Sequence, residues 1–140
     1  MKRFVAVSVC VMAVAALGMA GCATGAKGMT DEEQIAQRLQ DGIAAVKAKD
    51  FKKFESFVSA EFDSGVIGDK QDLLDYLENA DGMGFLDGLE VSLTDSETTI
   101  TDGTAVIDTV DVSGGFGSLT LTFTGAKENG VWMITSVDPY

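Results

Sequence analysis

The chain has 140 residues, of which 22 are acidic and 10 basic, so its formal net charge is −12 at pH 7. This balance argues against nucleic acid as a partner and against electrostatic adsorption to anionic lipid, because both need clustered Lys and Arg. The absence of histidine excludes Ser-His-Asp and Cys-His catalysis and the HExxH zinc site. Solubility accounts for the dispersed acids more simply than a cationic partner or Ca²⁺ does.

The N-terminus has the layout of an export signal. Lys2 and Arg3 precede an apolar run over residues 4–17, which is too short to cross a bilayer and is typical of a secretory signal peptide. Small residues and then Cys22 follow the run. This ending resembles the lipobox of bacterial lipoproteins, in which the peptide is cut before the cysteine and the cysteine is lipidated. An ordinary signal peptide that is cleaved elsewhere is the alternative.

The lipobox resemblance implies an exported protein that is anchored to the cell envelope through a lipid on Cys22. Since Ala23 rather than aspartate follows the cysteine, the resemblance favours the outer membrane if the host is Gram-negative. Cleavage removes Lys2 and Arg3 and changes the net charge to −14. Since Cys10 is removed and Cys22 would carry the lipid, no thiol remains for a disulfide or redox chemistry. The expected organisation is a signal peptide over residues 1–21, the lipidated cysteine and a flexible tether over 22–29, and one domain over 30–140.

The first helix is marked by its cap. Thr30 and Glu33 form a capping box, and the helix is expected to end near Lys49. One apolar stripe follows at spacings of four, four and three residues: Ile35, Leu39, Ile43 and Val46. The polar residues between them are expected to face water: Gln37, Arg38, Gln40 and Asp41.

Two further helices are expected. Asp50 caps the second, whose apolar face is formed by Phe51, Phe54, Phe57 and Val58. Aromatic residues at this spacing predict core rather than a cofactor site. Gly65 and Gly68 then interrupt the chain, and Asp69 caps a third helix over residues 69–80.

Beyond Gly84 the apolar period changes from helical to alternating, which predicts strands. Asp102-Gly103 and Asn129-Gly130 are typical of hairpin turns. The expected strands cover residues 89–93, 98–101, 104–112 and 119–124, with a final strand that bears Trp132 and Ile134. Helices followed by strands predict an α+β domain in which helices cover one face of an antiparallel sheet.

The order of elements and the closing pattern together resemble the NTF2-like (SnoaL-like) superfamily. The pattern is Lys-x-x-Gly-x-Trp-x-Ile, formed here by Lys127, Gly130, Trp132 and Ile134. The resemblance implies a cone in which about three helices pack on a curved antiparallel sheet around a cavity. In that superfamily the cavity is an active site, a binding site or filled core, and homodimers through the sheet are common. Trp132 is expected in the core.

NTF2-like enzymes commonly place an aspartate in the cavity as a general base. Asp63 and Asp108 are the candidates, with Tyr76 as a hydrogen-bond donor to Asp108. Asp108 points inward if the valines of its strand do. A one-residue shift or a bulge would turn Asp108 outward, and Ala105 and Ile107 would then supply the apolar face.

These observations predict a lipid-anchored binding protein without a cofactor, a metal or a nucleic acid partner. Its ligand would be a small apolar molecule in the cavity or an envelope protein on the sheet; a homodimer is left open. Two alternatives remain. One is a small enzyme of hydratase, isomerase or cyclase type that uses Asp63 or Asp108. The other is a structural envelope-assembly lipoprotein whose cavity is filled by its own phenylalanines.

Overall fold

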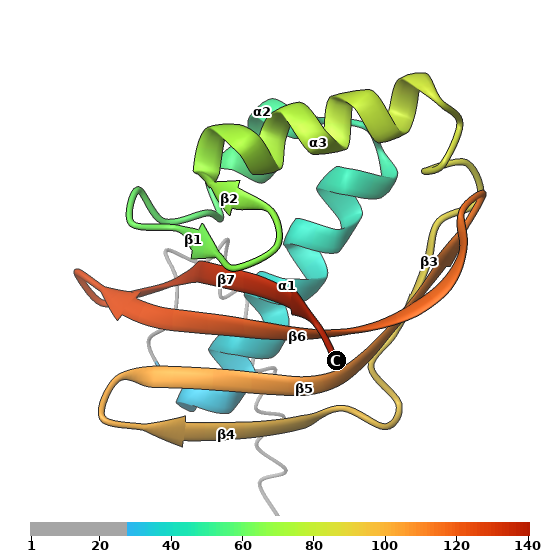
Figure 1. Cartoon of the computed structure of the whole chain (residues 1–140). Helices are drawn as coiled ribbons and strands as arrows, with labels where there is room; N and C mark the ends of the chain where they lie inside the picture. Colours follow the sequence, from blue (N-terminus) through green and yellow to red (C-terminus); the bar gives the residue numbers. More distant parts are fainter. Residues whose placement is uncertain (1–27) are drawn as a thin grey trace, which may run out of the picture.

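The computed structural model describes residues 28–140, in which helices precede a five-stranded antiparallel sheet (Figure 1). The α+β prediction is confirmed. The expected signal peptide and Cys22 lie outside the described residues. Within them, no helix combines the length and apolar character needed to cross a bilayer. The elements are α1 (Asp31–Lys47), α2 (Phe51–Glu55), β1 (Asp63–Ser64), β2 (Gly68–Asp69), α3 (Lys70–Gly82), β3 (Glu90–Ser92), β4 (Glu97–Thr101), β5 (Thr104–Gly114), β6 (Gly117–Glu128) and β7 (Val131–Pro139).

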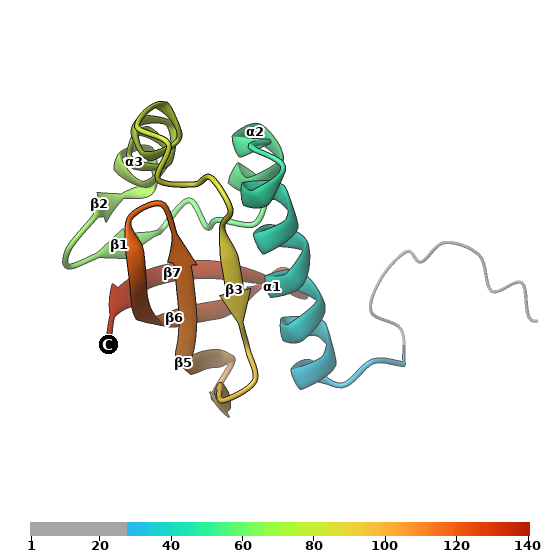
Figure 2. The same cartoon turned by 90° about the vertical axis from the view of Figure 1, so that its right-hand side faces the viewer.

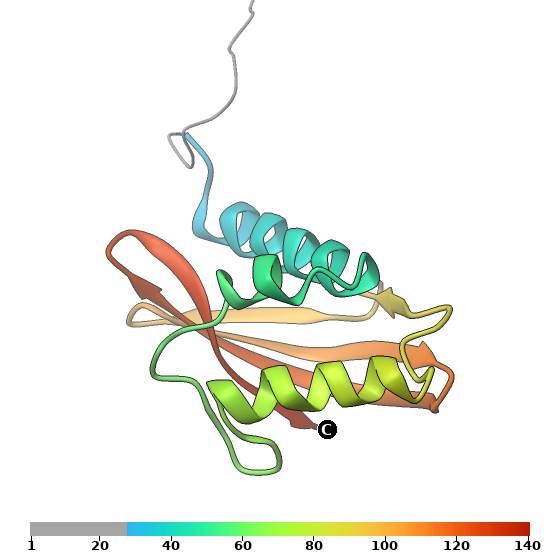
Figure 3. The ribbon, with the colours of Figure 1, turned by 90° about the horizontal axis from the view of Figure 1, so that it is seen from above.

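The sheet has the order β3-β5-β6-β7, and β4 pairs with the same edge of β5 as β3 does. The long hairpin of β5 and β6 bends, so that its far end rises beside the helices (Figures 1 and 2). Seen from above, α1 and α3 lie over the same side of the sheet (Figure 3). We call the side under the helices the inner face and the opposite side the outer face.

The capping box at the start of α1 is confirmed. The Glu33 amide donates to Thr30 Oγ1 over 3.2 Å, and the Thr30 amide donates to Glu33 Oε2 over 2.8 Å. Ile35 and Leu39 of the apolar stripe are buried against the sheet. The spacing of the stripe therefore places α1 on the inner face.

Arg38 does not face water, and this expectation was wrong. Its Nε donates to the Trp132 carbonyl oxygen over 3.0 Å, and its guanidinium carbon lies 4.4 Å from the centre of the Phe57 ring. Burial lowers the pKa of Arg38, and the nearby Asp41 carboxylate acts in the opposite direction. The long aliphatic stem allows the side chain to lie along the sheet and still reach polar partners.

The second helix begins as expected but is shorter. Asp50 caps it, accepting from the Lys53 amide over 3.0 Å, and it ends at Glu55. Phe57 and Val58 lie beyond it, in a segment that pairs with β7. There the Ile134 amide donates to the Phe57 carbonyl over 2.8 Å. The segment thereby covers an edge of the sheet that would otherwise be open.

A β-bulge interrupts β5. The pairing with β6 steps from Ile107–Phe123 to Val110–Leu121, so that Asp108 and Thr109 together oppose a single residue. Thr109 adopts a φ of 58° to make this step. Before the bulge Ala105 and Ile107 point inward, and after it Val110 does. The structure therefore contains the bulge that the sequence analysis left open, and Ala105 and Ile107 supply the apolar face in place of Val106 and Asp108.

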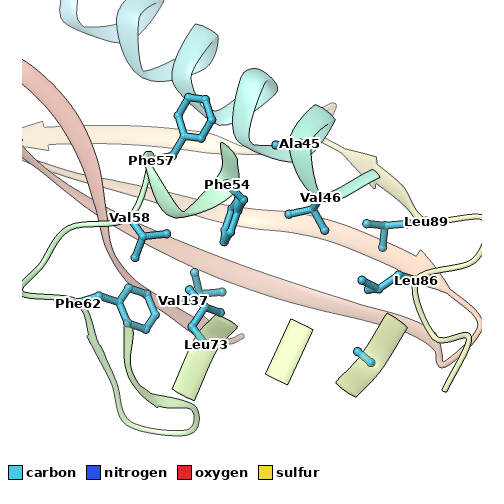
Figure 4. Close-up of a cluster of buried hydrophobic side chains, with 11 residues drawn as sticks. Ala45, Val46, Phe54, Phe57, Val58, Phe62, Leu73, Leu86, Leu89 and Val137 are labelled. Atoms are coloured by element: carbon cyan, nitrogen blue, oxygen red, sulfur yellow. The ribbon is translucent and has the colours of Figure 1, made fainter. Parts of the chain in front are cut away.

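The inner face of the sheet and the helices enclose two apolar clusters. One joins the end of α1, α2, α3 and the far part of the sheet, and it contains Phe54, Phe57 and Phe62 (Figure 4). The other joins α1 to β5 and β7 and contains Trp132, which is 4 % exposed. Trp132 is a core residue, as expected.

At the far end of the sheet, Gly115 allows the β5–β6 turn to lie close to the loop that follows α3. The Gly115 amide donates to the Phe85 carbonyl oxygen over 3.0 Å, which ties the loop after α3 to the β5–β6 turn. A Cβ atom on Gly115 would lie 2.5 Å from the Gly84 carbonyl oxygen, a separation that no side chain tolerates without a shift of backbone. The same loop is held by Lys49, whose Nζ lies 2.6 Å from Asp81 Oδ1 and 3.0 Å from Asp87 Oδ1.

We expect Gly115→Ala to lower the free energy of unfolding by about 1–3 kcal/mol, because backbone atoms must move apart to admit the methyl group. Gly82→Ala is the matched control. Its Cβ meets nothing within 4 Å, and its place in α3 favours alanine, so its stability should be unchanged or slightly higher. Urea unfolding followed by circular dichroism measures both; equal effects of the two substitutions would contradict the contact.

Asp31 fastens the start of α1 to the β6–β7 hairpin. Its Oδ1 accepts from Lys127 Nζ over 2.6 Å and from Trp132 Nε1 over 3.2 Å. The hydrogen bond from Lys127, supported by that from Trp132, lowers the pKa of Asp31 below its usual 3.8. The carboxylate therefore favours the folded state in its charged form.

Since the folded-state pKa of Asp31 is lower than the unfolded one, its contribution to stability is full above the unfolded value and is lost as the pH falls through the folded value. Asp31→Asn should therefore destabilise the protein at pH 7 and have less effect near pH 3. Unfolding midpoints in urea at both pH values test this, with Glu32→Gln in the same helical turn as the control. An unchanged cost of Asp31→Asn at low pH would refute the linkage.

Candidate functional site

The interior of the cone is filled. Phe54, Phe57 and Phe62 are each at most 6 % exposed; Phe57 lies beside α1, and all three belong to the apolar cluster under the helices (Figure 4). Between α1 and the sheet remains a crevice of about 30 Å³, lined among others by Arg38 and Trp132. A water molecule takes a similar volume in the liquid. The crevice is far below the several hundred Å³ that drug-sized ligands need.

Two of the three candidate catalytic residues lie on the surface. Asp63, in the small β1–β2 hairpin, is exposed and stands opposite Asp69. Tyr76 is 59 % exposed on α3. Neither Asp63 nor Tyr76 lines the crevice beside α1.

Asp108 lies on the outer face of the sheet. Its Oδ1 accepts from Thr122 Oγ1 over 3.0 Å. Thr122 stands between Leu121 and Phe123, both of which pack into the core, so its own side chain points the other way. The structure therefore does not bring Asp108 together with Asp63 or Tyr76 in a common cavity.

A larger hollow lies on the outer face, at the far end of the sheet, where Figure 2 looks onto β3, β5 and β6. We call it the outer groove; its volume is about 580 Å³. Val91 and Val112 of neighbouring strands pack against the core, so the residues beside them point outward. The lining consists of Lys47, Glu90, Val91, Ser92, Asp111, Val112, Ser113, Ser118, Leu119 and Thr120.

Outward side chains of the groove form two rows across the strands. Glu90, Ser113 and Ser118 make one row, and Ser92, Asp111 and Thr120 make the other. Within the second row, Thr120 Oγ1 donates to Asp111 Oδ1 over 2.7 Å, which fixes the carboxylate at the floor of the groove. The groove thus offers hydroxyl groups and two carboxylates side by side.

Acidic side chains continue along the outer face beyond the groove. Glu97 stands directly opposite Asp108. Asp138 pairs with Thr122 on the next strand, and hydrogen bonds from Ser136 and Ser64 lower its pKa. Like charges directly opposite each other destabilise a sheet.

The described residues contain no group of three His, Cys, Asp or Glu side chains that could hold a metal ion.

The acidic character of the outer face is visible in the sequence as an uneven distribution of charge, which no motif reveals. Residues 71–140 include thirteen acidic residues and one basic residue, Lys127. That lysine pairs with Asp31 of α1 and therefore does not neutralise the outer face. The acidic residues are dispersed along the chain, but the basic residues are not. Among residues 28–140, every Lys and Arg except Lys127 lies between Arg38 and Lys70.

Comparison with solved structures finds the same fold in other proteins. The chain aligns with an NTF-2 like protein of unknown function from Shewanella oneidensis at a TM-score of 0.62 and 15% identity, over 79% of this chain and 98% of that one. A protein of unknown function with a cystatin-like fold from Nostoc punctiforme aligns at a TM-score of 0.64 and 12% identity, over 79% of this chain and 92% of that one.

The chain has the NTF2-like fold. It also aligns with Bd1075 of Bdellovibrio bacteriovorus at a TM-score of 0.63 and 10% identity, over 75% of this chain, but it spans only 38% of that protein's length. No family model and no curated protein matches the sequence. At these identities the likeness establishes the fold alone.

We expect Phe54→Ala to cost about 3–5 kcal/mol of unfolding free energy, because it opens a cavity among the apolar side chains of the interior. Benzene should then bind and restore part of the thermal stability, since an apolar cavity of this size stays dry. Tyr76→Ala, at an exposed position on a helix, is the control and should change stability little. Benzene stabilising the unmodified protein equally would show that the interior is already open.

Proposed function

We propose that this protein is an exported, lipid-anchored binding protein that takes a macromolecular partner on its surface. The filled interior carries this proposal. With phenylalanines in the space where an NTF2-like cavity would lie, and a crevice of about 30 Å³ beside α1, a small apolar ligand has no room inside. The surface, with its outer groove of about 580 Å³, is then the place for recognition.

Anchoring is supported by the order of the N-terminal residues. The basic pair, the apolar run and Cys22 resemble a lipoprotein signal. Seven residues, 23–29, separate Cys22 from the cap of α1. Fully extended, they span at most about 3.5 Å each, so a lipid on Cys22 would hold the domain within about 25–30 Å of the membrane.

The two alternatives differ in what they require. Catalysis by Asp63 or Asp108 requires a carboxylate facing a bound substrate, and the positions of both side chains on the surface lend it no support. The assembly alternative shares the filled core with our proposal. It differs only in the kind of partner that the surface takes.

Intact-mass measurement on the full chain, produced in a bacterium and extracted from its membranes, tests the anchoring. We expect loss of residues 1–21 and a mass gain equal to a diacylglycerol, with or without a further acyl chain. Cys22→Ser should abolish both changes, whereas Ala23→Ser should retain them. A chain processed elsewhere, or found without lipid, would contradict the proposal.

A further inference from the structure

We propose that the outer groove binds an extended, cationic segment of a partner protein. This inference deepens the proposed surface-binding function and rests on it. It also revises the interpretation of the acidic composition as a matter of solubility alone.

Charge supplies the first argument. The lining contains the carboxylates of Glu90 and Asp111, and Lys47 is the only cation in it. The acids Glu97 and Asp108 continue the same face, which keeps like charges directly opposite each other across two strands. Such pairs cost stability in the isolated protein, and a bound cation relieves their repulsion.

The shape and the polar groups supply the second argument. The groove crosses three strands, and its hydroxyl groups from Ser92, Ser113 and Ser118 both donate and accept hydrogen bonds. A peptide backbone presents both kinds of partner, and lysine or arginine side chains suit the two carboxylates. The aliphatic stems of those side chains can lie along the strands between the two rows.

A second copy of this chain is a poor occupant of the groove. A two-fold contact through the outer face would bring two acidic surfaces together, each carrying Glu90 and Asp111. Residues 71–140 carry thirteen acids and one base, so most approaches of two copies through their sheets are repulsive. The homodimer through the sheet, common among NTF2-like proteins, is therefore disfavoured for this chain.

The position of the groove supplies the third argument. Lys47, at its rim, is the last residue of α1, whereas the tether joins the first turn of that helix. A helix of 17 residues is about 25 Å long. The described chain enters α1 at its first turn, so the groove beside Lys47 lies at the other end of the helix from the point where the tether joins.

Binding of an end-blocked, fluorescently labelled ten-residue lysine peptide to the full chain in uncharged detergent tests the inference. Anisotropy should show binding at about 20 mM salt that weakens toward about 150 mM, as expected for exposed charges. The double variant Glu90→Gln/Asp111→Asn should weaken binding about tenfold. Its control, Asp75→Asn/Glu78→Gln on the exposed side of α3, changes the net charge equally and should stay within about twofold.

A steric variant separates the groove from charge in general. Ser118→Trp adds bulk at an exposed position of the groove without changing any charge, and it should weaken the peptide about as much as the double variant. Circular dichroism checks that each variant is folded. A glutamate peptide of equal length should not bind.

Four results would overturn the inference: no binding of the lysine peptide at low salt, equal losses in the double variant and its control, an unaffected Ser118→Trp variant, or self-association that Lys52→Gln/Lys53→Gln abolishes. The last result would assign the groove to a second copy. Since Cys22 lipidation is measured independently by mass, any of these results would leave the anchoring proposal standing.

Discussion

The structure depends on one extra residue in β5. Before the bulge, residues with odd numbers point toward the helices, and after it residues with even numbers do. An unbroken alternation that kept Ala105 and Ile107 inward would turn Val110 outward and bury Asp111 among apolar side chains. A buried carboxylate without a partner costs several kcal/mol, so the bulge allows one long, bent strand to keep a single apolar face.

The bulge also creates the outer face. Because it changes the parity of β5, both Asp108 and Asp111 point away from the helices, where each accepts a hydrogen bond from a threonine of β6. The inner face becomes uniformly apolar and is completed by phenylalanines. Filled core and acidic surface are therefore consequences of the same register step.

Local chemistry made much of the fold predictable. The capping box at Thr30, the cap at Asp69 and the Asn129-Gly130 turn are encoded within a few residues, and each is found where the sequence places it. The second helix was predicted too long because Phe57 and Val58 satisfy a helical period equally well. Their amide and carbonyl groups instead pair with β7, which is distant in sequence.

The groove and Arg38 were harder to predict for the same reason. The polar character of Arg38 indicates water, but its position beside the Trp132 carbonyl depends on how α1 crosses the sheet. The outer groove likewise follows from the bulge and the bend of the hairpin. Only the charge of residues 71–140 was available from the sequence, and it required comparing the halves of the chain rather than searching for runs of acids.

Basic and acidic residues lie on different parts of the domain. The bases from Arg38 to Lys70 belong to the segment that runs from α1 to the start of α3, and the acids that lack basic neighbours belong mainly to the sheet. The tether joins the start of α1, whereas the groove lies beside the far end of that helix, so the point of attachment and the groove are separate surfaces. A cationic partner is then attracted to the groove while anionic lipid is repelled, so anchoring and recognition can act on one small domain without competing for the same surface.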